Sequence, residues 1–383
     1  MKPSLRKTTV VLAAGSMAAA LAVTAGPLVA SAAAPHGTNT ISDAVFVQTN
    51  DKTGNQILAY ARSATGSLSF VHAYDTGGKG AQLTGSAVDP LASQSALDFD
   101  AKADLLLAVN AGSNSFTAFH VKGDVLSHPQ VVHTGSLPTS VTSHGDYVYV
   151  LAAGGKGTVH GYSTASGSLV PILGSVRSLG LDPTASPQFL NTPGQLGVTP
   201  DGTQLVVTTK ANGSTIDVAR IGSTGNVGRF VENPSATPVP FAFAFDPHGR
   251  LVVTEAADSD VSTYGVDSDG SLTNASSVTD GMAAACWITE AEGYYFVMNA
   301  GSADVSSYQV SSGGVASLVA ADAGSTDAGP IDAAASSDGA FLYVEAGGAG
   351  TVDEFAVTSS GTLTSIGSAT GLSGTGIEGI VAS

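Results

Sequence analysis

Residues 105–121 read LLLAVNAGSNSFTAFHV, and the same pattern returns along most of the chain. An apolar strand leads into a turn rich in Asn, Gly and Ser, and an alternating strand with an aromatic or other apolar residue follows. Six further copies lie at 44–61, 147–163, 204–221, 250–266, 294–310 and 341–357. Corresponding turn positions from Asn110 to Ala346 recur every 42 to 57 residues. Repeats of this length, built from short strands, are typical of a β-propeller.

A further strand precedes most copies and is introduced by proline. Examples begin at Pro138, Pro193, Pro240 and Pro330, and residues 284–293 fill the same place with Ala instead of Pro. We take this strand as the innermost strand of each blade. The sequence therefore predicts an all-β fold, a seven-bladed β-propeller of four-stranded antiparallel blades.

The first copy, 44–61, has no such strand before it. The C-terminal residues 376–383, GIEGIVAS, have the pattern of an inner strand without a blade. We expect them to complete the blade that begins at residue 44, because joining the two ends closes the ring and removes free sheet edges.

The N-terminus has the features of a secretory signal peptide. Lys2, Arg6 and Lys7 precede an apolar stretch, and Ala30-Ser31-Ala32 forms a small-x-small cleavage site. We predict a signal peptide over 1–32, a short linker over 33–42 and the propeller over 43–383. The protein is expected to be secreted; the alternative is that the apolar stretch is kept as a membrane anchor. No later apolar run approaches the ~20 residues that a membrane helix needs.

Composition narrows the choice of partners. The leader carries three of the 14 basic residues and no acidic residue, so 11 basic and 31 acidic residues give the mature chain a charge of −20. This charge argues against nucleic acid or an anionic membrane as a partner. The single cysteine excludes an intramolecular disulfide, and the eight scattered histidines show no zinc-ligand spacing. We expect a monomer with no metal and no cofactor.

Two long insertions, at 74–96 and 170–192, fall on the same face of the predicted ring. Long loops on a rigid scaffold commonly form binding sites, so we expect a pocket over the central channel. The alternative is a pair of surface loops without a function. The candidate polar residues on this face are Gln94, Gln195, Glu255, Asn299 and Asp332, with Arg177 and Lys79 from the insertions. Asn is common in turns for structural reasons, whereas no turn requires the carboxylate of Glu255.

In these segments the chain resembles the lactonase family of seven-bladed propellers, which includes the propeller-type 6-phosphogluconolactonases and the carboxymuconate cyclases. The resemblance covers residues 43 to 383 and rests on 105–121, VTPDGTQLVVT, PFAFAFDPHGRLVVTEA and SSDGAFLYVEAG. It implies a lactone-opening hydrolase with Glu255 as the retained catalytic carboxylate.

The chain departs from the family pattern at other polar positions. Pro193-Gly194-Gln195-Leu196 stands where the family has two histidines, and Pro240-Phe241-Ala242 stands where it has Arg and His. The family arginine of the next blade is replaced within Met298-Asn299-Ala300-Gly301. The resemblance therefore supports the fold of the family more strongly than it supports the family's catalytic activity.

Two functions remain open. One is hydrolysis of a small, unphosphorylated lactone, with Glu255 as the base and Gln94, Arg177, Gln195, Asn299 and Asp332 binding the substrate. The other is a non-catalytic binding propeller that captures a carbohydrate-like ligand or a protein on the face with the insertions.

The only cysteine and the only tryptophan, Cys286 and Trp287, are adjacent. Aligned with the other inner strands, Cys286 falls with Gln195 and Asp332, near the axis, and Trp287 falls between neighbouring blades. We expect both to be buried, with Trp287 part of the core.

Overall fold

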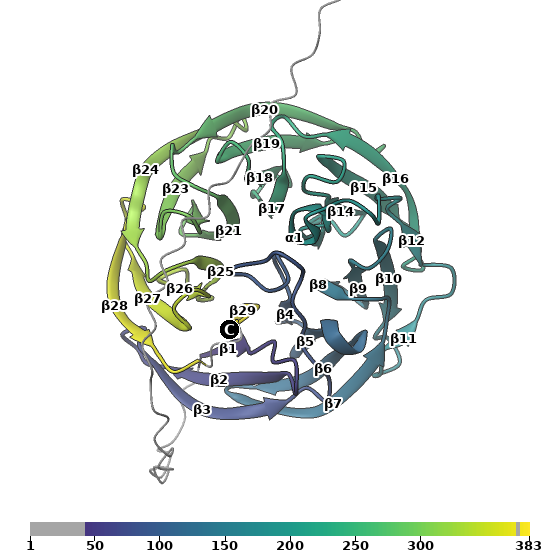
Figure 1. Cartoon of the computed structure of the whole chain (residues 1–383), viewed down its shortest axis with the longest axis horizontal. Helices are drawn as coiled ribbons and strands as arrows, with labels where there is room; N and C mark the ends of the chain where they lie inside the picture. The colour runs from purple at the N-terminus through teal and green to yellow at the C-terminus, as the bar shows by residue number, and fades with distance from the viewer. Residues whose placement is uncertain (1–42, 373–375) are drawn as a thin grey trace, which may run out of the picture. The chain divides into compact units, whose positions relative to one another are not determined.

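The computed structural model describes residues 43–372 and 376–383, and within them seven antiparallel sheets form a ring around a central axis (Figure 1). The predicted seven-bladed β-propeller is confirmed. The predicted signal peptide and linker lie outside the described residues.

Each blade is one sheet whose strands follow one another from the axis outward. The first blade contains β29 (Ile380–Ala382), β1 (Ala44–Gln48), β2 (Gln56–Arg62) and β3 (Leu68–Asp75). The second contains β4 (Leu97–Asp100), β5 (Leu105–Asn110), β6 (Ser115–Lys122) and β7 (Val125–His133), with a short 3-10 turn at Ala111–Ser113. The third contains β8 (Pro138–His144), β9 (Tyr147–Ala152), β10 (Thr158–Ser163), β11 (Val170–Pro171) and β12 (Arg177–Ser178).

The remaining four blades have the same order. The fourth contains β13 (Leu196–Val198), β14 (Gln204–Thr208), β15 (Thr215–Ile221) and β16 (Val227–Pro234), and the short helix α1 (Gln188–Asn191) precedes it. The fifth contains β17 (Pro240–Phe245), β18 (Leu251–Glu255), β19 (Asp260–Val266) and β20 (Leu272–Thr279). The sixth contains β21 (Ala285–Ala291), β22 (Tyr294–Asn299), β23 (Asp304–Val310) and β24 (Ala316–Ser325). The seventh contains β25 (Pro330–Ala335), β26 (Phe341–Ala346), β27 (Thr351–Val357) and β28 (Leu363–Ala369).

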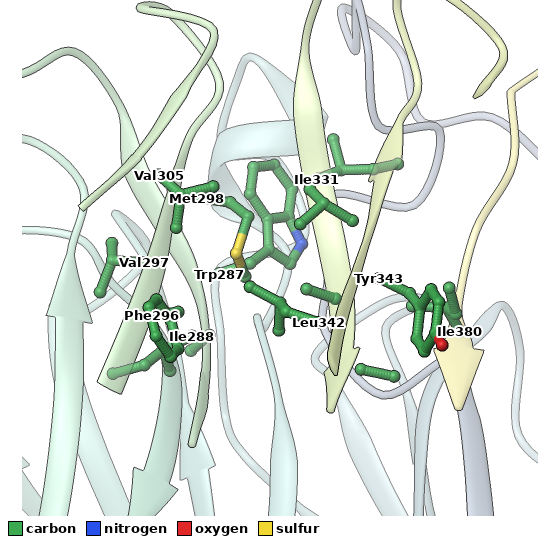
Figure 2. Close-up of a cluster of buried hydrophobic side chains, with 14 of the residues drawn as sticks. Trp287, Ile288, Phe296, Val297, Met298, Val305, Ile331, Leu342, Tyr343 and Ile380 are labelled. Atoms are coloured by element: carbon green, nitrogen blue, oxygen red, sulfur yellow. The ribbon is translucent and has the colours of Figure 1, made fainter. Parts of the chain in front are cut away.

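Burial explains why the repeated strands differ in composition. The second strands, such as β1, β14 and β18, are buried throughout because neighbouring blades cover both of their faces. Each accordingly contains an unbroken apolar run, such as Leu-Val-Val in β14 and in β18. The outer strands, such as β3, contain only half-buried and exposed residues. The largest apolar cluster among the described residues extends from blade five through blades six and seven to blade one and includes Trp287, Phe296 and Leu342 (Figure 2).

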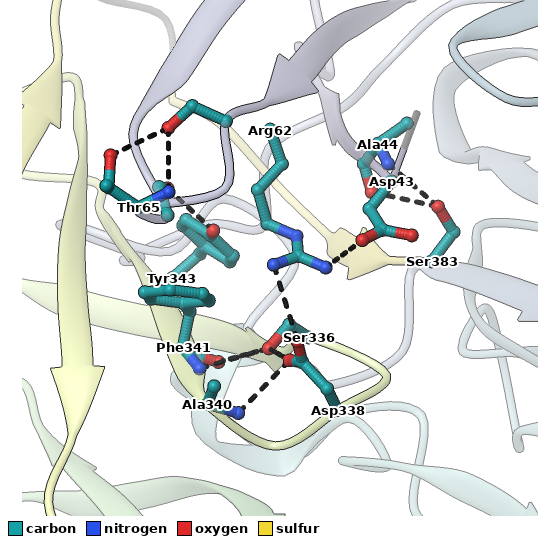
Figure 3. Close-up of polar contacts among 12 residues, drawn as sticks. Asp43, Ala44, Arg62, Thr65, Ser336, Asp338, Ala340, Phe341, Tyr343 and Ser383 are labelled. Carbon is teal, nitrogen blue, oxygen red and sulfur yellow. Dashed lines mark hydrogen bonds and ion pairs between the residues drawn. The ribbon is translucent and has the colours of Figure 1, made fainter. Parts of the chain in front are cut away.

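The C-terminal strand closes the ring, as predicted. β29 pairs with β1 in antiparallel register, with Phe46 opposite Val381. Ser383 Oγ accepts a hydrogen bond from Ala44 N at 2.9 Å and extends the junction beyond the strand (Figure 3).

Arg62 reinforces the boundary between the first and seventh blades. Its side chain is 4% exposed; it forms an ion pair with Asp43 and lies 3.6 Å from the carboxylate of Asp338 (Figure 3). The guanidinium also stands 5.3 Å from the centre of the Phe341 ring. Arg62 of β2 therefore contacts residues on both sides of the boundary between blades one and seven.

The inner strand of blade six differs from the expected register by one residue. Ile288 pairs with Val297, as Ala333 pairs with Val344 in blade seven. Val297 follows Ile288 by 9 positions and Val344 follows Ala333 by 11, so the β21–β22 turn is two residues shorter than the β25–β26 turn. Trp287, and not Cys286, therefore holds the position of Asp332. Both residues are buried, as predicted, and Trp287 packs against Phe241 of the neighbouring blade five, with 4.8 Å between the ring centres.

Candidate functional site

The first insertion runs into the ring and does not stand above it. The connection between β3 and β4 reaches the middle of the ring (Figure 1). Its residues 83–95, here called the plug, include the fully buried Leu91 and the buried Asp89 and Gln94. The expected pocket over the channel on this face is therefore filled by the chain itself.

The plug is hydrogen bonded to blades on several sides of the axis. Gln94 exchanges two hydrogen bonds with the backbone of Ile288 in blade six, at 2.8 and 3.0 Å. Trp287 donates its indole N–H to Ser93 O at 2.9 Å. On the opposite side, Gln94 N donates to Gly194 O at 3.1 Å. These contacts join blades four and six across the channel.

Two buried carboxyl groups meet under the plug. Asp89 belongs to the plug, and Glu378 precedes β29; the exposed fractions are 4% and 2%. The N–H of Leu91 donates to an oxygen of each group, at 2.9 Å in both cases. Asp89 also accepts from Ala92 N and Ser93 N, at 2.5 and 3.1 Å. Burial raises the pKa of both groups, and the nearby charge of Asp89 raises that of Glu378 further.

Lys210 lies beside this pair with no exposed surface. Its Nζ donates to Ala92 O at 2.5 Å, Phe189 O at 2.6 Å and Thr192 Oγ1 at 3.1 Å. Burial lowers its pKa to about 7, against the opposing influence of the nearby Asp89. All three ammonium protons have acceptors, which permits burial of the charge.

The channel remains hollow on the other side of the plug. A cavity of about 350 Å³ runs along the inner strands of blades one, two, six and seven. Gln94 and Ser95 of the plug and Asp332 are among its lining residues, together with Asp98, Phe99, Thr289, Glu290, Ser336 and residues of β29. The cavity is thus separated from the cluster around Lys210 by the plug.

Two carboxyl groups on the cavity wall have pKa values that are raised toward neutral pH. Burial raises the pKa of Asp332 to about 7, and the backbone N–H of Ala333, which donates at 2.9 Å, opposes this. Burial raises the pKa of Asp98 to about 6, although Ser143 Oγ donates to it at 2.7 Å. Neither carboxyl has a salt bridge within the described residues. A carboxyl with such a pKa can exchange protons at physiological pH.

Of the predicted site residues, the structure brings Gln94, Gln195 and Asp332 to the axis. Gln94 and Asp332 share the cavity, and Gln195 accepts from Phe243 N at 2.6 Å and lies 3.4 Å from Ser95 Oγ. Asn299, Arg177 and Lys79 are elsewhere.

Those three residues have structural contacts. Asn299 donates to Asp304 and to Ser306 Oγ inside blade six, at 2.8 and 2.7 Å. Arg177 is part of β12 on the outer side of blade three, where it donates to the backbone carbonyls of Gly174, Val176 and Gly228. Lys79 is exposed before the plug begins.

Glu255 is enclosed in blade five with no exposed surface. One carboxylate oxygen accepts from Ser235 Oγ and Tyr264 Oη, and the other accepts from Thr237 Oγ1 and Ser262 Oγ. Four hydroxyl donors occupy both oxygens, and Glu255 does not line the channel cavity. Its role as a base stays a prediction, and these surroundings favour a role in fixing the β16–β17 connection.

Sequence reasoning missed the residues that gather beneath the plug. They are Asp89, Lys210, Glu345 and Glu378, all buried. The only available signal was a polar residue within a short apolar context, as in GIEGI around Glu378. Cys286 adjoins the group, and burial raises its pKa to about 12, so its thiol is protonated.

Within residues 43–372 and 376–383, no three His, Cys, Asp or Glu side chains are grouped as metal ligands would be. In the same part of the chain no helix has the length and hydropathy to cross a bilayer.

Comparisons with known proteins show which solved structures share the fold of this chain. No family model matches the sequence, and no curated protein matches it. A periplasmic gluconolactonase from Pseudomonas aeruginosa superposes with a TM-score of 0.69 at 18% identity, covering 89% of this chain and 98% of that one. A crystal structure described as a putative 6-phosphogluconolactonase from Bacteroides fragilis has a TM-score of 0.68 at 16% identity, covering 91% and 100%. Similarity at this identity shows a shared fold, and the predicted resemblance to lactonase-type propellers is confirmed at that level.

Proposed function

We propose that the chain is an exported hydrolase of small, uncharged lactones, with its reaction site in the channel cavity and Asp332 as the general base. The observation that carries this proposal is a carboxyl with a pKa of about 7 on the wall of a 350 Å³ cavity at the propeller axis. A base with a pKa near the working pH transfers protons most effectively.

The fold supports the class of reaction. The two structures described above, named gluconolactonase and putative 6-phosphogluconolactonase, match almost over their full lengths. Because a shared fold does not by itself transfer an activity, the residues of this cavity must supply the chemistry. Export is supported by the leader pattern at 1–32 and agrees with the periplasmic source of the first relative.

The cavity offers the groups that lactone hydrolysis needs. Asp332 takes a proton from water while the water oxygen bonds to the lactone carbonyl carbon. The carbonyl oxygen then carries negative charge, and Ser95 Oγ, which lines the same cavity, is placed to donate to it. When the ring C–O bond breaks, the departing alkoxide takes the proton back from Asp332. The product is the open hydroxy acid.

Charge favours an unphosphorylated substrate. Asp98, Glu290 and Asp332 contribute carboxyl groups to the cavity, and its described lining residues contain no Lys, Arg or His. A phosphate would enter this space against like charge and without a cationic partner. We therefore expect glucono-δ-lactone to be a better substrate than its 6-phosphate.

The test compares Asp332→Asn with Asp217→Asn on a panel of lactones. Asp217 is a buried carboxyl of β15, and burial raises its pKa to about 6, but it does not line the cavity. We expect Asp332→Asn to lower kcat/KM by about a hundredfold to ten-thousandfold. We expect Asp217→Asn to leave kcat/KM within about twofold. The wild-type kcat/KM should rise with pH through about 7, because the base must be ionised.

Equal activity of the two variants would remove Asp332 as the base. Absence of turnover on every lactone, with the wild type folded, would favour the second candidate, a binding propeller. The lack of a cation among the described cavity residues is the observation that favours this alternative. Calorimetric titration with neutral sugars would then measure binding.

A further inference from the structure

We propose that the plug is a proton-operated latch: Asp89 and Glu378 share one proton while it is closed, and loss of that proton releases the plug and opens a second mouth of the channel, at which Lys210 and Cys286 become accessible. This inference is independent of the proposed catalytic function.

The first step is the geometry of the carboxyl pair. One N–H, that of Leu91, donates to both Asp89 and Glu378 at 2.9 Å, so the two accepting oxygens are neighbours. Both side chains are almost fully buried. Two carboxylates this close cannot both be ionised in a buried site, and a shared proton turns their repulsion into a hydrogen bond.

The second step is that this pair holds the plug to the ring. Asp89 organises the plug by accepting from the N–H groups of Leu91, Ala92 and Ser93. Glu378 stands on the ring, next to the closing strand β29, and accepts from Leu91 N and from Ser93 Oγ at 3.4 Å. When both groups are ionised, the carboxylate of Glu378 on the ring therefore repels the carboxylate of Asp89 on the plug.

The third step concerns the other ionisable groups that face the pair. Lys210 approaches from the β14–β15 turn and Cys286 from β21, and both interact electrostatically with Asp89. Glu345 of β26 and Asp332 of β25 also face the pair, and burial raises the pKa of both carboxyl groups. One oxygen of Glu345 has no hydrogen-bond partner among the described residues. Four carboxyl groups thus surround one ammonium group. The excess of acid makes the shared proton necessary for closure.

The direction of the pH effect follows from proton release. In an open, solvated state Asp89 and Glu378 regain ordinary pKa values near 4, so opening releases the shared proton above that pH. Lys210 has a pKa of about 7 in the closed state and about 10.4 when solvated, so opening takes up a proton above pH 7. Opening should increase between pH 5 and 7, by at most about tenfold per pH unit, and should level off above pH 7, where the two effects cancel.

Cys286 is the only cysteine and is buried beneath the plug, so its labelling reports opening. The rate with a small methanethiosulfonate reagent is measured from pH 5 to 9 and divided by the rate of the urea-unfolded chain at the same pH, which removes the ordinary ionisation of a thiol. We expect the ratio to rise up to pH 7 and then to become flat.

In Glu378→Gln the amide can donate a hydrogen bond to Asp89 without a shared proton. We therefore expect the ratio of the folded to the unfolded labelling rate of this variant to stay constant between pH 5 and 7. Asp217→Asn removes a buried carboxyl remote from the plug and should keep the wild-type profile. Hydrogen exchange of the Leu91, Ala92 and Ser93 amides in the wild type, with each rate divided by the intrinsic exchange rate of the unfolded chain at the same pH, gives a second reading that needs no variant. A ratio that does not change with pH, an unchanged profile in Glu378→Gln, or exchange of these three amides with no rise between pH 5 and 7 would overturn the proposal.

Discussion

Glu255 shows how a residue can be conspicuous in a sequence and still have its role decided by its neighbours. Its position at the end of β18 made it the best catalytic candidate, because no turn requires a carboxylate there. Its four donors come from Ser235, Thr237, Ser262 and Tyr264, which are up to 20 residues away in sequence. Nothing in the residue pattern indicates that these hydroxyl groups converge.

This environment gives a prediction for Glu255→Gln. The amide replaces one acceptor oxygen by a donor that faces hydroxyl groups, and hydrogen bonds to a charged group are stronger than neutral ones. We expect the free energy of unfolding to fall by about 2–3 kcal/mol, with kcat unchanged. Urea denaturation and lactone turnover of the same preparation measure both. A large loss of kcat in a variant of unchanged stability would restore Glu255 as the base.

At the scale of elements, the repeats predicted strand order, the inner strands and the closure by residues 376–383. They could not predict β11 and β12, which the second insertion adds along β10. They also misaligned Cys286 and Trp287 by one residue with the other inner strands, because the β21–β22 turn is two residues shorter than the β25–β26 turn. Strand existence follows from local pattern, whereas register depends on the length of each turn.

The closure gives a prediction for Arg62→Met. The substitution removes an ion pair with Asp43, a contact with Asp338 and a cation–π contact with Phe341. Since both acidic partners are partly exposed, we expect a loss of only about 1–2 kcal/mol of unfolding free energy. Arg229→Met, at an exposed position of β16, is the matched control and should stay within about 0.5 kcal/mol. Equal effects in urea denaturation would show that Arg62 does not secure the closure.

For the whole molecule, buried carboxyl groups with raised pKa values set the pH dependence of stability. Burial raises the pKa of Asp98 and Asp217 to about 6 and that of Asp332 to about 7. Such groups favour the folded state most below their unfolded pKa of about 3.9, and this contribution is lost as pH rises through the folded pKa. Burial lowers the pKa of His160 and, to about 7, that of Lys210, and both act in the opposite direction; Lys210 does so mainly above pH 7.

We therefore expect the free energy of unfolding to be at least about 2 kcal/mol higher at pH 5 than at pH 7.5. Below pH 4 stability should fall again, because hydroxyl and backbone donors lower the pKa of Asp201 and Asp338. Urea denaturation across this range measures the curve, and Asp217→Asn should make the change between pH 5 and 7.5 smaller. Stability that rises steadily from pH 5 to 7.5 would contradict this assignment.

The sequence by itself determined the blade number, the strand order and the closure of the ring, because each blade repeats one local pattern of apolar strands and turns. Only the tertiary structure decided which distant side chains meet at the axis. The plug enters the channel and brings together Asp89, Lys210 and Glu378, which come from three distant segments. Such convergence depends on the path of a non-repeating loop across the axis, and no local periodicity records that path.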